Sequence, residues 1–324
     1  MTARILPIDA NPEAALGHAL AALSRGEPVA LPTETVYGLA GDATNPDAIT
    51  AIYEAKGRPR FNPLIAHMAD LAMAERHAAF SPLARRLAAA FWPGALTLVL
   101  PLSPTSAVHA LATAGLDTVA VRVPKGFAAR LIAAFGKPLA APSANRSGRI
   151  SATSAAHVAG DLGERIGLIL DGGPTPIGVE STIVQVEGDR LSLLRPGGVP
   201  VEEIEAVAGV PVERPTAGGK VVAPGMLSSH YAPEAGLVLE AQACAPGDAV
   251  IRFGGTALEG DEKAALVLDL SPTGDLREAA ANLFAFLKRA DASGAGTIRV
   301  APVPREGLGE AINDRLARAA APRA

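Results

Sequence analysis

The chain has 324 residues, of which 49% are apolar and 4% aromatic, and its formal net charge at pH 7 is −4. This composition is sufficient for one large or two ordinary cores built mainly from Ala, Leu, Val and Ile. The single cysteine, Cys244, excludes an intrachain disulfide and a cysteine-based metal cluster. Lys and Arg form no stripe of the kind that binds nucleic acid, and only residues 56–60, KGRPR, are locally basic.

The N-terminal half predicts alternating helices and strands. Asn11 and Pro12 are typical of a helix start, and Gly26 ends that helix. A buried strand is expected at 28–32, and a second helix runs from Asn45 and Pro46 to near Gly57. Further strands are expected at 63–68, 96–102, 118–124, 138–142 and 167–173, with helices at 81–91 and 127–135. Residues 181–196 predict two strands joined by a Gly-Asp turn, so we expect an α/β fold with a mixed sheet.

The composition changes over residues 209–233, which are dense in Pro, Gly and Ser. A connection of this length is typical of a linker or an active-site lid. After it, short strands are expected at 237–241, 249–253, 265–270 and 297–303, with helices at about 275–290 and 309–320. We therefore predict a larger domain over 1–208, a linker or lid over 209–233 and a smaller α/β domain over 234–324.

No sequence feature predicts export or membrane insertion. Residues 1–17 have no apolar core of signal-peptide length before Asp9 and Asn11. The longest apolar run, residues 87–102, is interrupted by Pro93 and Gly94 and is too short to span a bilayer. We therefore expect a soluble, cytoplasmic protein.

Polar clusters adjoin several of the predicted strands. Thr33, Glu34 and Thr35 follow the strand at 28–32, HMAD follows PLIA, PSANRSG follows PLAA, and GVEST adjoins TIVQV. In isolation each cluster is equally well explained as an ordinary polar turn. Because ligands of open α/β sheets bind outside the carboxyl ends of the strands, the four clusters together predict one pocket.

The segment KGRPRFNP, residues 56–63, places three cations among two prolines and a glycine. Most such clusters are solvated helix ends. Here the prolines stiffen the segment, so Lys56 and Arg58 are expected to be presented to phosphate oxygens from a fixed loop. The chain has no G-x-S-x-G, H-E-x-x-H, Walker A, G-x-G-x-x-G or S-x-x-K motif. Spacing alone thus predicts a pocket for a phosphate-rich ligand beside a small polar one, without naming the reaction.

Taken in order, seven motifs resemble the YrdC family: PTETVYGLAGDA, KGRPRFNPL, FWPGALTLVL, AGLDTVAVRVP, APSANRSG, GVESTIV and LLRPG. The continuation, APGMLSSHYAP and a C-terminal α/β domain that contains REGLGEAINDR, resembles the longer two-domain form of that family. The resemblance implies an open, twisted, mixed YrdC-like sheet followed by a smaller Rossmann-like α/β domain.

The resemblance also implies a synthase that joins L-threonine, bicarbonate and ATP into threonylcarbamoyl-adenylate and releases pyrophosphate. A downstream transferase complex would use the product to modify the tRNA adenosine beside the anticodon. Mg²⁺ is expected to arrive with ATP, because the sequence shows no dedicated carboxylate cage.

Carried over residue by residue, the resemblance assigns the following site. The candidate L-threonine residues are Thr35, His67, Arg122, Pro142 and Ser181. The candidate ATP residues are Lys56, Arg58, Asn62, Thr118, Ser143, Asn145, Arg195 and Tyr231. Lys56 and Arg58 are also the candidate catalytic cations, because they would offset charge on the leaving pyrophosphate. No general base and no metal ligand is assigned. Tyr231 is expected to reach the nucleotide when the linker folds over the pocket.

Two alternative functions fit part of the pattern. An RNA-binding YrdC-like module would use a basic concavity, but the pI near 5.9 argues against RNA as the main ligand. Carbamoyl transfer of the hydrogenase-maturation kind would require zinc-finger-like segments, which a single cysteine excludes. The synthase interpretation is favoured, with little direct nucleic-acid binding.

Overall fold

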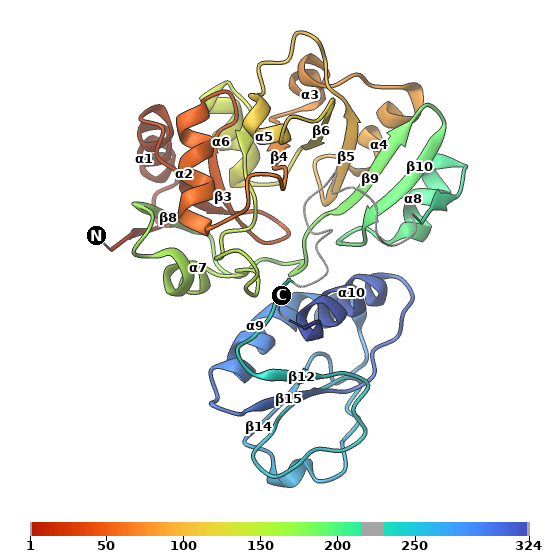
Figure 1. The fold of residues 1–324 in the computed structure, drawn as a ribbon. Helices are drawn as coiled ribbons and strands as arrows, with labels where there is room; N and C mark the ends of the chain where they lie inside the picture. The colour runs from red at the N-terminus through yellow and green to blue at the C-terminus, as the bar shows by residue number, and fades with distance from the viewer. Residues whose placement is uncertain (1, 215–229, 323–324) are drawn as a thin grey trace.

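A computed structural model describes residues 2–214 and 230–322, which form a large and a small α/β domain (Figure 1). The helices are α1 (Pro12–Ser24), α2 (Pro46–Lys56), α3 (Leu71–His77), α4 (Pro82–Phe91), α5 (Ala110–Thr113), α6 (Phe127–Phe135), α7 (Ala155–Leu162), α8 (Val201–Ala208), α9 (Leu276–Asp291) and α10 (Leu308–Ala320), with a 3-10 turn at Asp261–Lys263. The strands are β1 (Arg4–Pro7), β2 (Val29–Pro32), β3 (Tyr37–Asp42), β4 (Ile65–His67), β5 (Leu96–Pro101), β6 (Thr118–Arg122), β7 (Leu139–Ala140), β8 (Leu168–Asp171), β9 (Thr182–Glu187), β10 (Arg190–Arg195), β11 (Val212–Glu213), β12 (Gly236–Val238), β13 (Ala249–Arg252), β14 (Leu266–Asp269) and β15 (Thr297–Val300).

The helix starts follow from the capping chemistry that the sequence predicts. The side chains of Asn11, Asn45 and Ser81 each accept a hydrogen bond from a backbone N–H in the first turn of their helix, and a proline occupies the first turn each time. Gly57 ends α2 in the left-handed conformation, with φ 60°. The second predicted helix therefore ends where the basic segment begins.

The large sheet is mixed, with the strand order β1-β8-β2-β3-β7-β4-β6-β5-β9-β10-β11. The predicted hairpin at 181–196 is confirmed as the antiparallel pair β9 and β10. The sequence did not predict β3, which lies antiparallel to β2 and is buried along its whole length. A Cβ at Gly41 would lie 3.0 Å from Ile52 Cδ1, so the glycine lets helix α2 approach this strand. Residues 33–36, which include the polar Thr33, Glu34 and Thr35, consequently form the turn of a hairpin.

The small domain is a parallel sheet in the order β12-β15-β13-β14. Helices α9 and α10 lie between this sheet and the large domain (Figure 1). The apolar core around them includes Val36, Ile150 and Val179 of the large domain. The two domains therefore share one packed apolar surface, and the predicted fold class is confirmed.

The domain boundary predicted at residue 208 stays a prediction. Strand β11 pairs in parallel with β10, so the large sheet continues into the segment expected to be a linker. Residues 215–229 of that segment lie outside the described residues. Among the helices that the structure describes, none has the length and apolar character needed to cross a membrane.

Candidate functional site

A pocket brings together the polar clusters that the sequence placed at strand ends. It contains about 550 Å³ of empty space, including solvent at its mouth. Its walls come from the β2–β3 turn, the ends of β4 and β6, the loop after β7, the segment before β9 and the end of β10. The lining residues are Thr33, Thr35, Val36, Gly38, Arg58, Ile65, His67, Arg122, Ala141, Pro142, Ser143, Glu180, Ser181, Arg195, His230 and Tyr231.

One wall of the pocket contains a buried ion pair. Arg122 Nη2 lies 2.8 Å from Glu34 Oε1, and both atoms are buried. Arg122 Nε donates to the carbonyl of Gly94 at 3.0 Å, and Glu34 Oε2 accepts from the amide of Lys125 at 3.0 Å. Burial by itself would raise the pKa of Glu34. Attraction to Arg122 and the hydrogen bond from the Lys125 amide lower this pKa by more than burial raises it, so it lies below its usual value. Arg122 is therefore held in place through Nε and Nη2 where it lines the pocket, and a guanidinium there suits a carboxylate ligand.

The four other residues predicted for threonine, Thr35, His67, Pro142 and Ser181, line the same pocket. His67 is the register partner of Arg122 across parallel strands β4 and β6. The hydroxyl of Thr35 lies 2.8 Å from that of Thr33, and the hydroxyl of Ser181 lies 2.7 Å from that of Thr97. The structure thus groups a cation, an imidazole and hydroxyls, a set that suits a small polar zwitterion.

The buried histidines predict how stability depends on pH. Burial first, and repulsion from Arg122 second, lower the pKa of His67 to about 3; burial likewise lowers the pKa of His230 to about 3. Below about pH 6.5 the unfolded chain binds protons at both rings while the folded chain does not. The free energy of unfolding should therefore be highest above about pH 6.5 and fall toward pH 5. Urea unfolding of the wild type and of His67→Gln at several pH values measures this free energy. If it falls as steeply toward pH 5 in His67→Gln as in the wild type, His67 does not contribute to the pH dependence.

Two of the cations predicted for the nucleotide, Arg58 and Arg195, also line the pocket and are called its phosphate wall below. Arg58 Nη2 donates to the carbonyl of Pro63 at 2.9 Å, and its Nε donates to that of Asn62 at 3.2 Å. Burial lowers the pKa of Arg58 to about 10, so the guanidinium keeps its charge at neutral pH. Arg195 donates through Nε and Nη2 to the carbonyl of Ser181. Two rigid guanidinium groups facing one cavity form a suitable site for phosphate oxygens.

Lys56 is placed differently from the sequence expectation. Its ammonium donates to the carbonyls of Ser143 and Asn145, both at 2.5 Å, and it does not line the pocket. Burial, followed by repulsion from Arg58, lowers the pKa of Lys56 well below its usual value. The structure therefore shows Lys56 holding the PSAN loop through two backbone carbonyls, whereas the sequence predicted a cation presented to phosphate from a fixed loop. Its role toward phosphate stays a prediction.

Three other residues predicted for ATP lie outside the lining of the pocket. Asn145 Nδ2 donates to the carbonyls of Arg146 and Arg149. The side-chain Oδ1 atoms of Asn145 and Asn62 are buried without a hydrogen bond. Thr118 is the first residue of β6, and Arg122 is the last. Their assignments to ATP stay predictions.

Glu34, Glu180 and His230 are site residues that the sequence reasoning did not assign. Glu180 Oε1 accepts from Ser151 Oγ at 2.5 Å, and its Oε2 accepts from Arg315 Nε at 2.8 Å. Burial raises its pKa, but Arg315 and Arg195 lower it more, to about 2, so Glu180 is ionised. His230 Nδ1 is buried without a hydrogen bond. The signals were present in GVEST and in the dipeptide His230-Tyr231, but nothing in them indicated burial.

Tyr231 lines the pocket, as a residue that contacts a nucleotide would. Its ring stacks on Phe284 of α9, with centroids 5.4 Å apart, and the guanidinium of Arg315 lies 5.3 Å from its centroid. The C-terminal domain therefore holds Tyr231 at the pocket. Ser228 and Ser229, which belong to the predicted lid, lie outside the described residues.

The described residues bring together no group of three or more His, Cys, Asp or Glu side chains that could hold a metal ion. Glu180 is the one acidic residue among the described lining residues, and both of its oxygens already accept hydrogen bonds. A metal ion in this pocket would therefore depend on oxygens from the ligand.

Comparisons with known proteins agree with this geometry. Residues 21–197 match the family model Sua5_yciO_yrdC, described as telomere recombination. Residues 199–321 match the model Sua5_C, described as the C-terminal domain of threonylcarbamoyl-AMP synthase. The chain belongs to the Sua5/YciO/YrdC family. The resemblance stated from the seven motifs is thereby confirmed.

Members of the Sua5 family cover nearly all of the chain. The threonylcarbamoyl-AMP synthase of Bacillus subtilis is 44% identical over 94% of this chain and 92% of its own length. That of Pyrococcus abyssi is 44% identical over 92% and 91%. The crystal structure of P. abyssi Sua5 complexed with L-threonine superposes with a TM-score of 0.88, covering 98% of this chain and 97% of that one at 39% identity. The chain is accordingly an enzyme of the Sua5 family in its two-domain form.

Proposed function

We propose that the chain joins L-threonine, bicarbonate and ATP into L-threonylcarbamoyladenylate and releases pyrophosphate. The observation that carries this proposal is one pocket lined by two chemically different sets of residues. One set is the Arg122–Glu34 pair beside His67, and the other is Arg58 and Arg195 of the phosphate wall. The first suits an amino-acid carboxylate and the second suits phosphates. The L-threonine bound by P. abyssi Sua5 and the name shared by both curated relatives support this assignment.

Burial of the pocket suits the first chemical step. The amino group of threonine must be neutral to attack carbon dioxide, and the resulting carbamate is unstable in bulk water. A site that excludes water and fixes both reactants removes these obstacles. Burial of Thr35, His67 and Ser181, each at most 4% exposed, provides such surroundings for the amino acid.

In the second step the carbamate oxygen attacks the α-phosphorus of ATP, and the bond to pyrophosphate breaks. Negative charge then develops on the leaving phosphates, where Arg58 and Arg195 offset it. Lys56 fixes the carbonyls of Ser143 and Asn145, so that the PSAN loop keeps its shape beside the phosphates. Mg²⁺ would enter chelated to the nucleotide and neutralise phosphate charge there.

The product would serve threonylcarbamoylation of the tRNA adenosine beside the anticodon, the role that follows from the family. A downstream tRNA-modifying transferase complex would take up the labile adenylate, and the reaction would take place in the cytoplasm. The direct test is incubation with L-threonine, bicarbonate, ATP and Mg²⁺, followed by mass spectrometry of the adenylate. Pyrophosphate release that does not depend on threonine or bicarbonate would refute the assigned reaction.

Replacing Arg58 tests the phosphate wall. Arg58→Ala removes a buried guanidinium whose protein partners are two backbone carbonyls. The loss of one charge-assisted contact should cost about 1.5–3 kcal/mol of ATP binding, raising the KM for ATP about 10- to 150-fold. Arg60→Ala is the matched control, because Arg60 lies in the same segment and is exposed. Steady-state pyrophosphate release measures both variants; a folded Arg58→Ala with the wild-type KM for ATP would exclude the phosphate role.

A further inference from the structure

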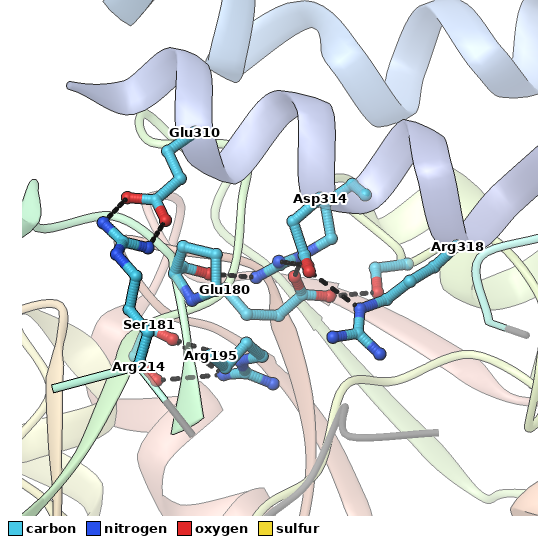
Figure 2. A network of polar contacts seen from close by, with 10 residues as sticks. Glu180, Ser181, Arg195, Arg214, Glu310, Asp314 and Arg318 are labelled. Carbon is cyan, nitrogen blue, oxygen red and sulfur yellow. Dashed lines mark hydrogen bonds and ion pairs between the residues drawn. The ribbon is translucent and has the colours of Figure 1, made fainter. Parts of the chain in front are cut away.

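A single arginine of the C-terminal domain joins three parts of the pocket wall. Arg315 lies on α10 and is fully buried. Its Nε donates to Glu180 Oε2 at 2.8 Å, its Nη2 donates to the carbonyl of Pro196 at 2.9 Å, and its guanidinium lies over the ring of Tyr231. Asp314 provides a second carboxylate, 2.5 Å from Nη1. Figure 2 shows the polar network in which Glu180, Arg195 and Asp314 take part.

Two partners of this arginine line the pocket, and a third adjoins a lining residue. Glu180 and Tyr231 line the pocket, and Pro196 directly follows Arg195 of the phosphate wall. The main chain of α10 takes part as well, since the carbonyl of Arg318 accepts from the amide of His230 at 3.2 Å. Helix α10 therefore contacts both the acidic residue of the pocket and the segment that carries Tyr231.

Close backbone packing also joins the GVEST segment of the large domain to helix α9 of the C-terminal domain. A Cβ at Gly178 would lie 2.3 Å from the carbonyl oxygen of Ala280 and 2.4 Å from Ala281 Cα, both on α9. The segment that carries Glu180 is thus in direct backbone contact with the C-terminal domain. The ring of Tyr231 stacks on Phe284 of the same helix, so the segment that carries Tyr231 is packed against α9 as well.

Other ion pairs cross between the domains without reaching the pocket. Arg214 pairs with Glu310 (Figure 2), and Lys288 pairs with Asp161 at 3.1 Å. The side chain of Arg214 is 58% exposed, whereas that of Arg315 is 0% exposed. If domain attachment were the only function of these contacts, exposed pairs would serve it without burying a guanidinium beside the substrates.

We propose that Arg315 is a positioning residue of the adenylate-forming pocket, through which the C-terminal domain holds Glu180 and Tyr231 in register with the phosphate wall. This inference rests on the proposed function. Its physical basis is that binding groups work only when their supporting contacts fix them, and a displacement of about 1 Å can cost about 100-fold in rate. The C-terminal domain is then part of the pocket wall rather than an attached module.

The test uses the full chain with Arg315→Met, Arg315→Lys and the control Arg214→Met. Threonine-dependent pyrophosphate release gives kcat and the KM values for ATP and threonine. Calorimetry gives the Kd of ATP, and thermal melting shows whether each variant is folded. We expect Arg315→Met to raise the KM and Kd for ATP and to lower kcat, each on the order of tenfold. The KM for threonine should stay within about threefold, since the contacts of Arg122 are untouched. Arg214→Met should match the wild type.

Arg315→Lys keeps the charge but cannot reach Glu180 and Pro196 together, so it should show the same pattern with a smaller effect. It also replaces Arg315→Met as the test if the methionine variant does not fold. Wild-type kinetics in a folded Arg315 variant would overturn the inference. Equal effects of Arg214→Met and Arg315→Met, or equal changes in both KM values, would also overturn it, because they would indicate domain attachment alone. If the wild type forms no adenylate, the proposed function fails, and the Kd of ATP still tests the position of Arg315.

Discussion

Replacing Gly197 with alanine is expected to abolish most of the activity. A Cβ at this position would lie 2.3 Å from the carbonyl oxygen of Glu180 and 2.4 Å from both Ser181 C and Thr182 N. All three contacts are backbone atoms of the GVEST segment, which cannot rotate away as a side chain can. The RPGG turn that follows β10 is therefore pressed directly against the segment that supplies Glu180 and Ser181 to the pocket.

The expected cost has two parts. Forcing a methyl group into packed backbone costs about 1–3 kcal/mol of stability. Displacement of Ser181 and Glu180 by about 1 Å should lower the turnover about 100-fold. Gly17→Ala is the matched control, because its Cβ would meet nothing within 4 Å in helix α1 and should be neutral or stabilising. Thermal melting and pyrophosphate release measure both variants. If Gly197→Ala keeps the stability and turnover of the wild type, the RPGG turn can move away from the GVEST segment without cost, and the prediction is wrong.

Removing Arg122 is expected to damage the fold and the threonine site at once. Arg122→Gln leaves Glu34 buried without its counterion, and breaking a buried pair in this way costs about 3–5 kcal/mol. The variant should melt at a lower temperature than the wild type. Because protonation of the stranded carboxyl relieves the cost, its deficit in the free energy of unfolding should shrink as the pH is lowered toward about 5.

The double variant Glu34→Gln with Arg122→Gln separates folding from binding. Neutralising both partners removes the stranded charge, so most of the lost stability should return. Affinity for L-threonine should not return, because the charge-assisted contact with its carboxylate, worth about 1.5–3 kcal/mol, is still missing. Threonine titration by calorimetry, next to urea unfolding, tests both claims. Threonine binding by the folded double variant at wild-type strength would remove Arg122 from the amino-acid site.

Prediction from the sequence was most successful where local chemistry decides the structure. The helices that start after Asn11, Asn45 and Ser81 form as predicted, because capping and proline act within one turn. It failed at β3, whose residues 37–42 do not alternate in polarity because both faces of the strand are covered. Only the pairing with β2 on one side and β7 on the other makes this segment a strand.

In the site, too, the sequence predicted which residues take part, whereas the fold decided which of them lie next to each other. The resemblance to the YrdC family predicted Thr35, His67, Arg122, Ser181 and Arg195, and the structure brings these residues together in one pocket. Spacing could not show that Ser181 precedes its strand while Arg195 ends its own. In the antiparallel pair β9 and β10 the start of one strand lies beside the end of the other, so these two residues meet.

By itself, the sequence determined the α/β class, the two domains and the family, because these depend on local propensity and on motifs in a fixed order. The tertiary structure alone decided which charges face each other. Lys56 is turned toward the carbonyls of the PSAN loop, Glu34 neutralises Arg122, and Arg315 reaches Glu180 across 135 residues of chain. The physical reason is that burying a charge is favourable only with a partner in place, and that partner is chosen by the packing of distant segments, which no local pattern encodes.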